Sequence, residues 1–219
     1  MTKHPQSRYL EVLAASLRTV HQQGDAITAK DFSSLCEHIL EAFDHLGTIM
    51  YFAKLEMGGK VESIKRVSGQ LTTLREVVEA DVKANKATVK GSCARNLHRL
   101  MLVITFVRLM LSNLLDNPTM QLKDALWAAY QGSLHPIHTY MVRTAVWAGL
   151  VTMPTRETFM RSIGETEESA RAHVPEVVAA ARDVVQRVEA LYGNAIKMPA
   201  SDLTYIPMTG PPASVSTAK

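Results

Sequence analysis

The chain contains few of the residues that break helices or carry redox and metal chemistry. Its 219 residues include 11 glycines, 9 prolines and 2 cysteines, and no stretch rich in glycine, proline or serine divides it. Cys36 and Cys93 are isolated, without the Cys-x-x-Cys spacing of a zinc site or a redox pair. We therefore expect a single domain with reduced thiols, cytoplasmic and without cofactor or metal.

Sequence motifs of the common enzyme classes are also missing. The chain has no Gly-x-Ser-x-Gly elbow, no phosphate-binding P-loop and no Gly-x-Gly-x-x-Gly. His135 and His138 stand three apart, but no cysteine or carboxylate nearby completes a metal site. A formal charge of +3, without basic runs interleaved with aromatics, argues against nucleic acid. It remains compatible with an anionic membrane surface. We expect neither an enzyme nor a nucleic-acid-binding protein.

Apolar residues recur at spacings of three and four along most of the chain, and no stretch alternates at period two. This pattern predicts an all-α fold of about eight helices. We expect a helix over 7–22 and a second one from about 28 toward 55, followed by a kink or break at Gly58-Gly59. Further helices are expected over 61–78, 92–115 and 122–131, and then from Pro136, after Pro154 and over 167–192. Residues 1–30 would add the N-terminal helix of the same domain, 31–196 the core, and 197–219 an irregular tail.

The most apolar stretch follows a pair of arginines. Residues 100–115 are interrupted by Arg108 and Asn113, so we expect this helix to be buried or to line a cavity rather than to span a membrane. Arg95 and Arg99, four apart, lie on one helical face just before it. A basic pair beside an apolar helix suits an anion with a hydrocarbon end. Alternatively, the pair lies on a solvated face, with its aliphatic stems packed over apolar neighbours.

Two other places combine polar side chains with apolar surroundings. Glu56 and Lys60 are four apart, as in many exposed ion pairs, but Tyr51 and Phe52 flank them and leave a polar site possible. His138 opens an amphipathic stretch and is a candidate to hydrogen-bond a ligand. An ordinary structural role remains open for each of them.

Three blocks together resemble the glycolipid transfer protein family, and most closely its ceramide-1-phosphate-transferring branch, which includes the plant accelerated-cell-death protein. The blocks are FDHLG with FAKLEMGGKV (43–61), KGSCARNLHR (90–99), and HTYMVR with MPTR (138–156). The resemblance extends over about 32–192. It implies a two-layer helical sandwich that encloses the hydrocarbon chains of a sphingolipid and holds its headgroup at the surface.

The resemblance also implies roles for individual residues. Glu56 would anchor the sphingoid amide and hydroxyl, and His138 would bind the amide carbonyl. Lys60, Arg95 and Arg99 would bind the phosphate headgroup. Glu56 stands where the family has Asp, Leu102 where the phosphate branch has a further basic residue, and Tyr140 where the family has Trp. The remaining assignments are membrane docking for Tyr140 and contact with the hydrocarbon chains for Phe52, Leu102, Phe106 and Val142.

These features predict a monomeric, non-enzymatic carrier that moves ceramide-1-phosphate between membranes and binds each membrane transiently. Two other functions remain open. One is a lipid-sensing regulator, for example of cell death, that binds the same lipid and acts through a protein partner. The other is a carrier of neutral glycosphingolipids or of another phospholipid.

Overall fold

The computed structural model describes residues 8–194 and 196–199. Over these residues the chain forms nine α-helices and three short 3-10 helices. The described residues form no β-strand, and their one β-bridge pairs Thr28 with Thr73. The all-α prediction is confirmed. The α-helices are α1 (Tyr9–Gln22), α2 (Ala29–Glu41), α3 (Thr48–Val67), α4 (Leu74–Lys83), α5 (Cys93–Asp116), α6 (Leu122–Gln131), α7 (Tyr140–Gly149), α8 (Arg156–Ser162) and α9 (Glu167–Ala190). The 3-10 helices are η1 (Ala42–His45), η2 (His135–Ile137) and η3 (Leu150–Thr152).

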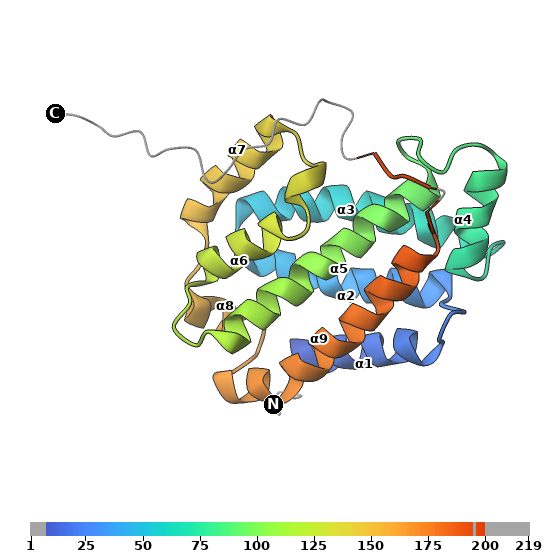
Figure 1. The fold of residues 1–219 in the computed structure, drawn as a ribbon. Helices are drawn as coiled ribbons and strands as arrows, with labels where there is room; N and C mark the ends of the chain where they lie inside the picture. Colours follow the sequence, from blue (N-terminus) through green and yellow to red (C-terminus); the bar gives the residue numbers. More distant parts are fainter. Residues whose placement is uncertain (1–7, 195, 200–219) are drawn as a thin grey trace, which may run out of the picture.

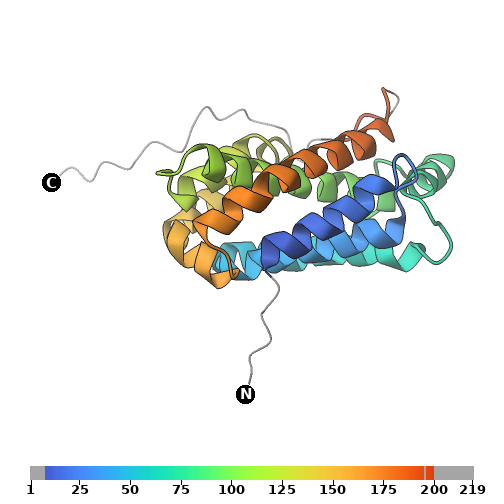
Figure 2. The same ribbon diagram turned by 90° about the horizontal axis from the view of Figure 1, so that it is seen from below.

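The helices form two layers. In one layer α2 packs between α1 and α3, and in the other α5 packs between α9 and α6. The layers meet where α1 contacts α9 and where α3 contacts α5, and Figure 2 shows them stacked. Helix α4 lies beside the start of α5, whereas α8 lies near its end (Figure 1). The two-layer helical sandwich predicted from the family resemblance is confirmed.

Helix α5 is the central element of the fold. By length and hydropathy alone it could cross a membrane, but 61% of its most apolar 18-residue window is buried inside the protein. It packs against α9, α6, α3 and α4. The expectation that this apolar stretch is a buried helix is confirmed, and its start is where the candidate site lies.

Two predicted helix boundaries are wrong. The helix expected over about 28–55 ends at Glu41, and after η1 the chain turns at Gly47, whose φ is +82°. Only glycine adopts such a conformation at little cost, which explains the break. By contrast, no break occurs at Gly58 and Gly59, which lie within α3 and are followed by helix as far as Val67.

The helix expected over 61–78 is also two helices. Helix α3 ends at Val67, and α4 begins after Thr73, whose side chain accepts from the backbone of Glu76 while Glu76 bonds back to the backbone of Thr73. This reciprocal capping box defines a new helix start. In the predicted tail, 197–199 are not helical, and 200–219 lie outside the described residues.

Candidate headgroup site and apolar cavity

The first turn of α5 is capped from two sides. The hydroxyl of Ser92 accepts from the backbone N–H of Arg95 at 3.2 Å, and the carboxylate of Asp81 in α4 accepts from the N–H of Ala94 at 2.7 Å. Both contacts satisfy N–H groups that have no partner inside the helix. Gly91, at φ +87°, makes the turn into the helix possible. The start of α5 is therefore fixed in place.

Arg95 and Arg99 project from this fixed turn and are buried, at 9% and 7% exposure. This burial is incompatible with the alternative that they lie on a solvated face. Arg95 Nη1 donates to the backbone oxygen of Thr88 at 3.0 Å, and Arg99 Nη2 donates to that of Pro199 at 2.6 Å. A buried cation requires compensation by hydrogen bonds or negative charge. These positions suit the binding of an anion.

His98 lies between the two arginines in sequence. Burial, followed by the charges of Arg99 and Arg95, lowers the pKa of His98 to about 4. The imidazole is therefore neutral at pH 7, and its Nδ1 lies 3.2 Å from Arg99 Nη1. Its ring also packs edge-on against Tyr192 in the segment after α9. His98 is thus a neutral neighbour that adds no positive charge beside the arginines.

Hydrogen bonds between α3 and α5 bring Lys60 to the same place. Asn96 donates to the hydroxyl of Ser63 at 2.8 Å, and Cys93 bonds to the backbone oxygen of Ser63 through sulfur at 3.6 Å. Lys60, three residues before Ser63, bonds to Glu56 with an Nζ to Oε1 distance of 2.8 Å. The lysine side chain is only 18% exposed, whereas that of Glu56 is 65% exposed. The predicted pair exists, with the lysine held inward.

The short helix η2 and the start of α7 hold His138. Arg143 is buried and donates from Nε to the backbone oxygen of His135 at 3.0 Å, which fixes the turn. His138 follows this turn and precedes α7, which begins at Tyr140. The expected helix from Pro136 is therefore wrong in its start, because Pro136 forms η2 instead.

The His138 ring is partly buried against Tyr130 of α6. The hydroxyl oxygen of Tyr130 lies 3.0 Å from Nδ1, and the two ring centroids are 5.6 Å apart. Burial lowers the pKa of His138 to about 4; Glu56 opposes this effect, and Arg99 and Arg143 reinforce it. The imidazole is therefore neutral at physiological pH.

The five residues predicted to bind the headgroup, Glu56, Lys60, Arg95, Arg99 and His138, all line one cavity of about 410 Å³. Among its lining residues are four cationic side chains and one carboxylate, which gives a formal charge of +3 with His138 neutral. Arginine forks and lysine ammonium groups both bind phosphate oxygens well. The charged lining residues are Glu56, Lys60, Lys90, Arg95 and Arg99.

A second cavity of about 270 Å³ is lined mostly by apolar side chains. Three residues predicted to contact hydrocarbon chains, Phe52, Phe106 and Val142, line it. The fourth, Leu102, lies partly buried against the core, outside the residues that line this cavity, and Val103 lines it instead. On α5 the two neighbours lie about 100° apart around the helix axis, so they face different sides.

The two cavities share part of their walls. Glu56, Met57, His138 and Val142 line both of them. A basic chamber therefore adjoins an apolar one, with a carboxylate and a neutral imidazole at the boundary. Such a site fits an amphipathic molecule that carries an anionic group at one end and hydrocarbon at the other.

The chain matches a known protein family over this region. The family model described as "Glycolipid transfer protein (GLTP)" matches residues 27–165. The chain belongs to the glycolipid transfer protein family. It is 32% identical to the ACD11 homolog protein of Arabidopsis thaliana over 168 residues, which cover 77% of this chain and 73% of that relative. It is 23% identical to human ceramide-1-phosphate transfer protein over 177 residues, or 74% and 82% of the two chains.

Solved structures confirm the family fold. A mutant of Arabidopsis accelerated-cell-death 11, complexed with C12 ceramide-1-phosphate, superposes with a TM-score of 0.82 at 23% identity and covers 85% of this chain and 96% of its own. Human ceramide-1-phosphate transfer protein in complex with the 12:0 lipid gives a TM-score of 0.76 at 20% identity, over 86% and 98% of the chains.

Exposed apolar side chains gather on two helices beside the apolar cavity of this family member. Tyr51, Phe52 and Leu55 are exposed on α3, and Tyr140 and Met141 are exposed at the start of α7. Helices α3 and α7 contact each other, and Phe52 also lines the cavity. The predicted docking residue Tyr140 thus belongs to a wider apolar surface on α3 and α7.

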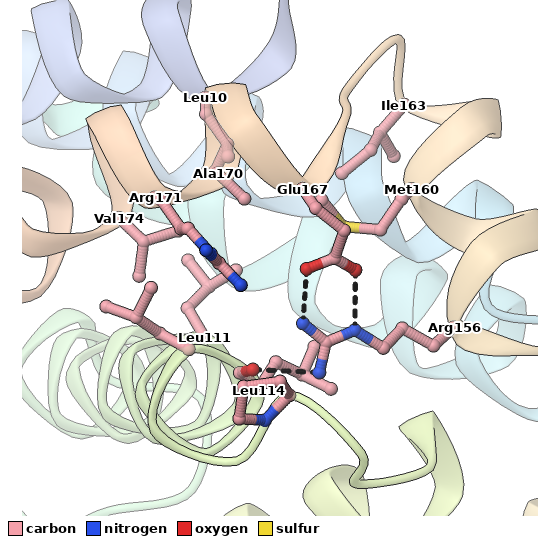
Figure 3. Close-up of a pocket in the computed structure, with 12 residues that line it drawn as sticks. Leu10, Leu111, Leu114, Arg156, Met160, Ile163, Glu167, Ala170, Arg171 and Val174 are labelled. Atoms are coloured by element: carbon pink, nitrogen blue, oxygen red, sulfur yellow. Dashed lines mark hydrogen bonds and ion pairs between the residues drawn. The ribbon is translucent and has the colours of Figure 1, made fainter.

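A third, smaller cavity near the end of α5 has a structural explanation (Figure 3). Its volume of about 20 Å³ is little more than the ~10–15 Å³ that one water needs. Arg156 makes two hydrogen bonds to Glu167, of 2.8 and 2.7 Å, and donates to the backbone oxygen of Leu114 at 2.8 Å. Arg156, part of the third sequence block that resembles the family, therefore joins the end of α5 to α8 and α9.

Sequence reasoning missed two residues of the site. Lys90 lies in the second sequence block without a predicted role, yet it lines the basic cavity from the loop before α5. Tyr130 lies in the predicted helix 122–131 but was not singled out, although it bonds to His138. Helical spacing does not relate Tyr130 to His138, because α6 ends at Gln131 and η2 intervenes.

Proposed function

We propose that this protein carries a phosphorylated sphingolipid, of the ceramide-1-phosphate type, between membranes without changing it chemically. The observation that carries the proposal is the wall shared by the basic and apolar cavities. A lipid that spans this wall places its phosphate among the cations and its chains among apolar side chains. The ceramide-1-phosphate named for the relatives above supports the same ligand class.

The basic cavity supports phosphate recognition. Hydrogen bonds that involve a charged group contribute about 1.5–3 kcal/mol each, more than neutral ones. Lys60, Lys90, Arg95 and Arg99 bring several such donors to one chamber. In the proposal these donors replace the water and counter-ions that the phosphate loses when it leaves the membrane surface.

The boundary residues support recognition of an amide. A carboxylate accepts hydrogen bonds, and a neutral imidazole can donate one from its second nitrogen. Glu56 and His138 at the boundary would therefore meet the N–H and C=O of a sphingolipid amide. Glu56 is one methylene longer than the aspartate usual in the family, and α3 continues as a helix through Gly58 and Gly59.

The apolar cavity and the exposed apolar surface on α3 and α7 support extraction from a membrane. Burial of each CH₂ contributes about 0.8 kcal/mol, so a long chain leaves the bilayer only if another apolar environment receives it. In the proposal Tyr140 and its exposed neighbours dock on the bilayer, and the lipid enters the adjoining cavity. The same proposal includes a cytoplasmic monomer that binds membranes transiently, and the free thiols of Cys36 and Cys93 suit a reducing compartment.

Transfer of radiolabelled ceramide-1-phosphate from donor to acceptor vesicles tests this proposal. A carrier moves label in proportion to its concentration, and chromatography recovers the lipid intact. Tight binding without transfer would favour the lipid-sensing regulator instead. Conversion of the label to another compound would show an enzyme and contradict the proposal.

A further inference from the structure

Tyr130 is the aromatic residue that contacts the neutral histidine at the boundary of the two cavities. It is 3% exposed and lies on α6. Tyr130 and Leu126 are the residues of α6 that line the apolar cavity. Its ring packs against Trp127 and His135 as well as against His138, with centroids 5.6 Å away in each case. Packing on several sides fixes the direction in which the hydroxyl points.

The hydroxyl of Tyr130 has one hydrogen to donate, and a buried donor without a partner is costly. Within the described residues, the partner recorded for this hydroxyl is Nδ1 of His138, at 3.0 Å. Burial raises the pKa of Tyr130, so the phenol keeps its hydrogen at physiological pH. The arrangement that uses this hydrogen has Tyr130 as the donor and Nδ1 as the acceptor.

A neutral imidazole carries one N–H, on either Nδ1 or Nε2. If Nδ1 accepts the hydrogen bond from Tyr130, the ring hydrogen must be on Nε2. His138 lines both cavities, so its second nitrogen then presents a donor to a ligand and cannot accept from one. The partner of a histidine nitrogen commonly determines the tautomer in this way.

We propose that Tyr130 is a positioning residue that holds His138 in the Nε2–H tautomer, so that the site selects lipids with a carbonyl acceptor next to the phosphate-bearing group. The proposal deepens the lipid-carrier function and rests on it for the choice of ligand. Tyr130 itself acts through the imidazole, and Glu56, the acceptor across the same boundary, completes the selection of an amide.

The first test needs no lipid. We would label the protein with ¹⁵N-histidine and determine the tautomer of His138 from its ring nitrogen shifts at pH 7. The wild type should show Nε2–H with an unprotonated Nδ1. Tyr130→Phe should shift the ring toward a mixture of both tautomers. An Nδ1–H tautomer in the wild type, or no change in the Tyr130→Phe variant, would overturn the proposal.

The second test compares two lipids with the same phosphate group. Ceramide-1-phosphate has an amide carbonyl, whereas a 1,2-dialkyl glycerol 3-phosphate has no carbonyl. Tyr130→Phe should weaken binding of ceramide-1-phosphate about three- to tenfold, the range for one neutral hydrogen bond, and leave binding of the dialkyl lipid unchanged. Equal weakening for both lipids would show a purely structural role and contradict the proposal.

Tyr9→Phe is the matched control. Tyr9 also has a raised pKa through burial, and its hydroxyl donates to the backbone oxygen of Ile39 at 3.3 Å, within the α1–α2 layer. This variant loses a tyrosine hydroxyl bond without touching His138, so it should bind both lipids like the wild type. If wild-type protein bound neither lipid, the proposed function would fail, while the tautomer measurement would still test Tyr130.

Discussion

At the scale of single residues, the buried arginine pair has the largest expected effect on ligand binding. We expect Arg99→Gln to slow transfer of ceramide-1-phosphate about 10- to 100-fold, because one or more hydrogen bonds between charged groups disappear. Vesicle transfer assays measure this effect. Arg18→Gln is the control, since Arg18 is an exposed arginine on α1 that pairs with Glu176 of α9. Equal rates for wild type and Arg99→Gln would argue against phosphate recognition by α5.

The two neutral histidines should make stability depend on pH. Burial lowers the pKa of both His98 and His138 to about 4, below the usual 6.5. Between these values the unfolded chain binds more protons than the folded protein, so the free energy of unfolding falls as the pH decreases from about 6.5 to about 4. Urea unfolding at several pH values measures this, and His138→Gln should flatten the profile. Identical profiles for the variant and the wild type would contradict the account.

At the scale of helices, much of the fold could be predicted because the apolar pattern of α1, α5, α6 and α9 is regular. Pro175 lies within α9, inside the helix expected over 167–192, without ending it. Two of the wrong boundaries share one cause: apolar periodicity continues across a break. It does so at Gly47, where a left-handed turn separates α2 from α3, and at 68–73, where the capping box of α4 begins a new helix.

The site was predictable where its residues share a helix and less so where separate elements meet. Arg95 and Arg99 on α5, and Glu56 and Lys60 on α3, were found from a spacing of four. The contacts of Lys90 and Tyr130 depend on how a loop and α6 pack against these helices, and local spacing carries no information about that packing. The resemblance to the family supplied the connection between α3, α5 and His138.

The glycines of α3 give a test at this scale. A Cβ added at Gly58 or Gly59 would meet nothing within 4 Å, and both residues are helical. We therefore expect Gly59→Ala to raise the free energy of unfolding by about 0.4–1 kcal/mol, because the unfolded chain loses conformational freedom. Gly47→Ala should be destabilising, since φ there is +82°. Thermal unfolding compares the two, and a less stable Gly59→Ala variant would contradict the continuous helix.

The segment after α9 gives a second test. The backbone oxygen of Pro199 accepts from Arg99, and the chain reaches it by running back toward the start of α5 (Figure 1). A chain that ends at residue 195 lacks this acceptor, whereas one that ends at residue 201 keeps it as a neutral peptide oxygen. Because a phosphate would compete for the same donor, we expect the shorter chain to bind ceramide-1-phosphate several-fold more tightly.

Comparing the two truncated chains tests the segment that carries this contact, since both lack residues 202–219. Ile196 and Met198 also pack against the core, so thermal unfolding must show that both chains are folded at the assay temperature. Equal affinity for the lipid would mean that Pro199 does not compete with the headgroup.

At the scale of the whole molecule, the two layers hold a basic chamber and an apolar chamber against each other. Helix α5 contributes to both: its first turns carry the arginines, and Val103 and Phe106 line the apolar side. Lys60 and Phe52 of α3 contribute in the same way. The central claim is that this arrangement selects a lipid by its phosphate headgroup.

The most direct test is transfer of labelled ceramide-1-phosphate and labelled galactosylceramide between vesicles, measured side by side with wild-type protein. The two lipids share the ceramide part and differ in headgroup charge. The account predicts fast transfer of ceramide-1-phosphate and little transfer of galactosylceramide. Galactosylceramide transfer as fast as, or faster than, that of the phosphate lipid would contradict the account.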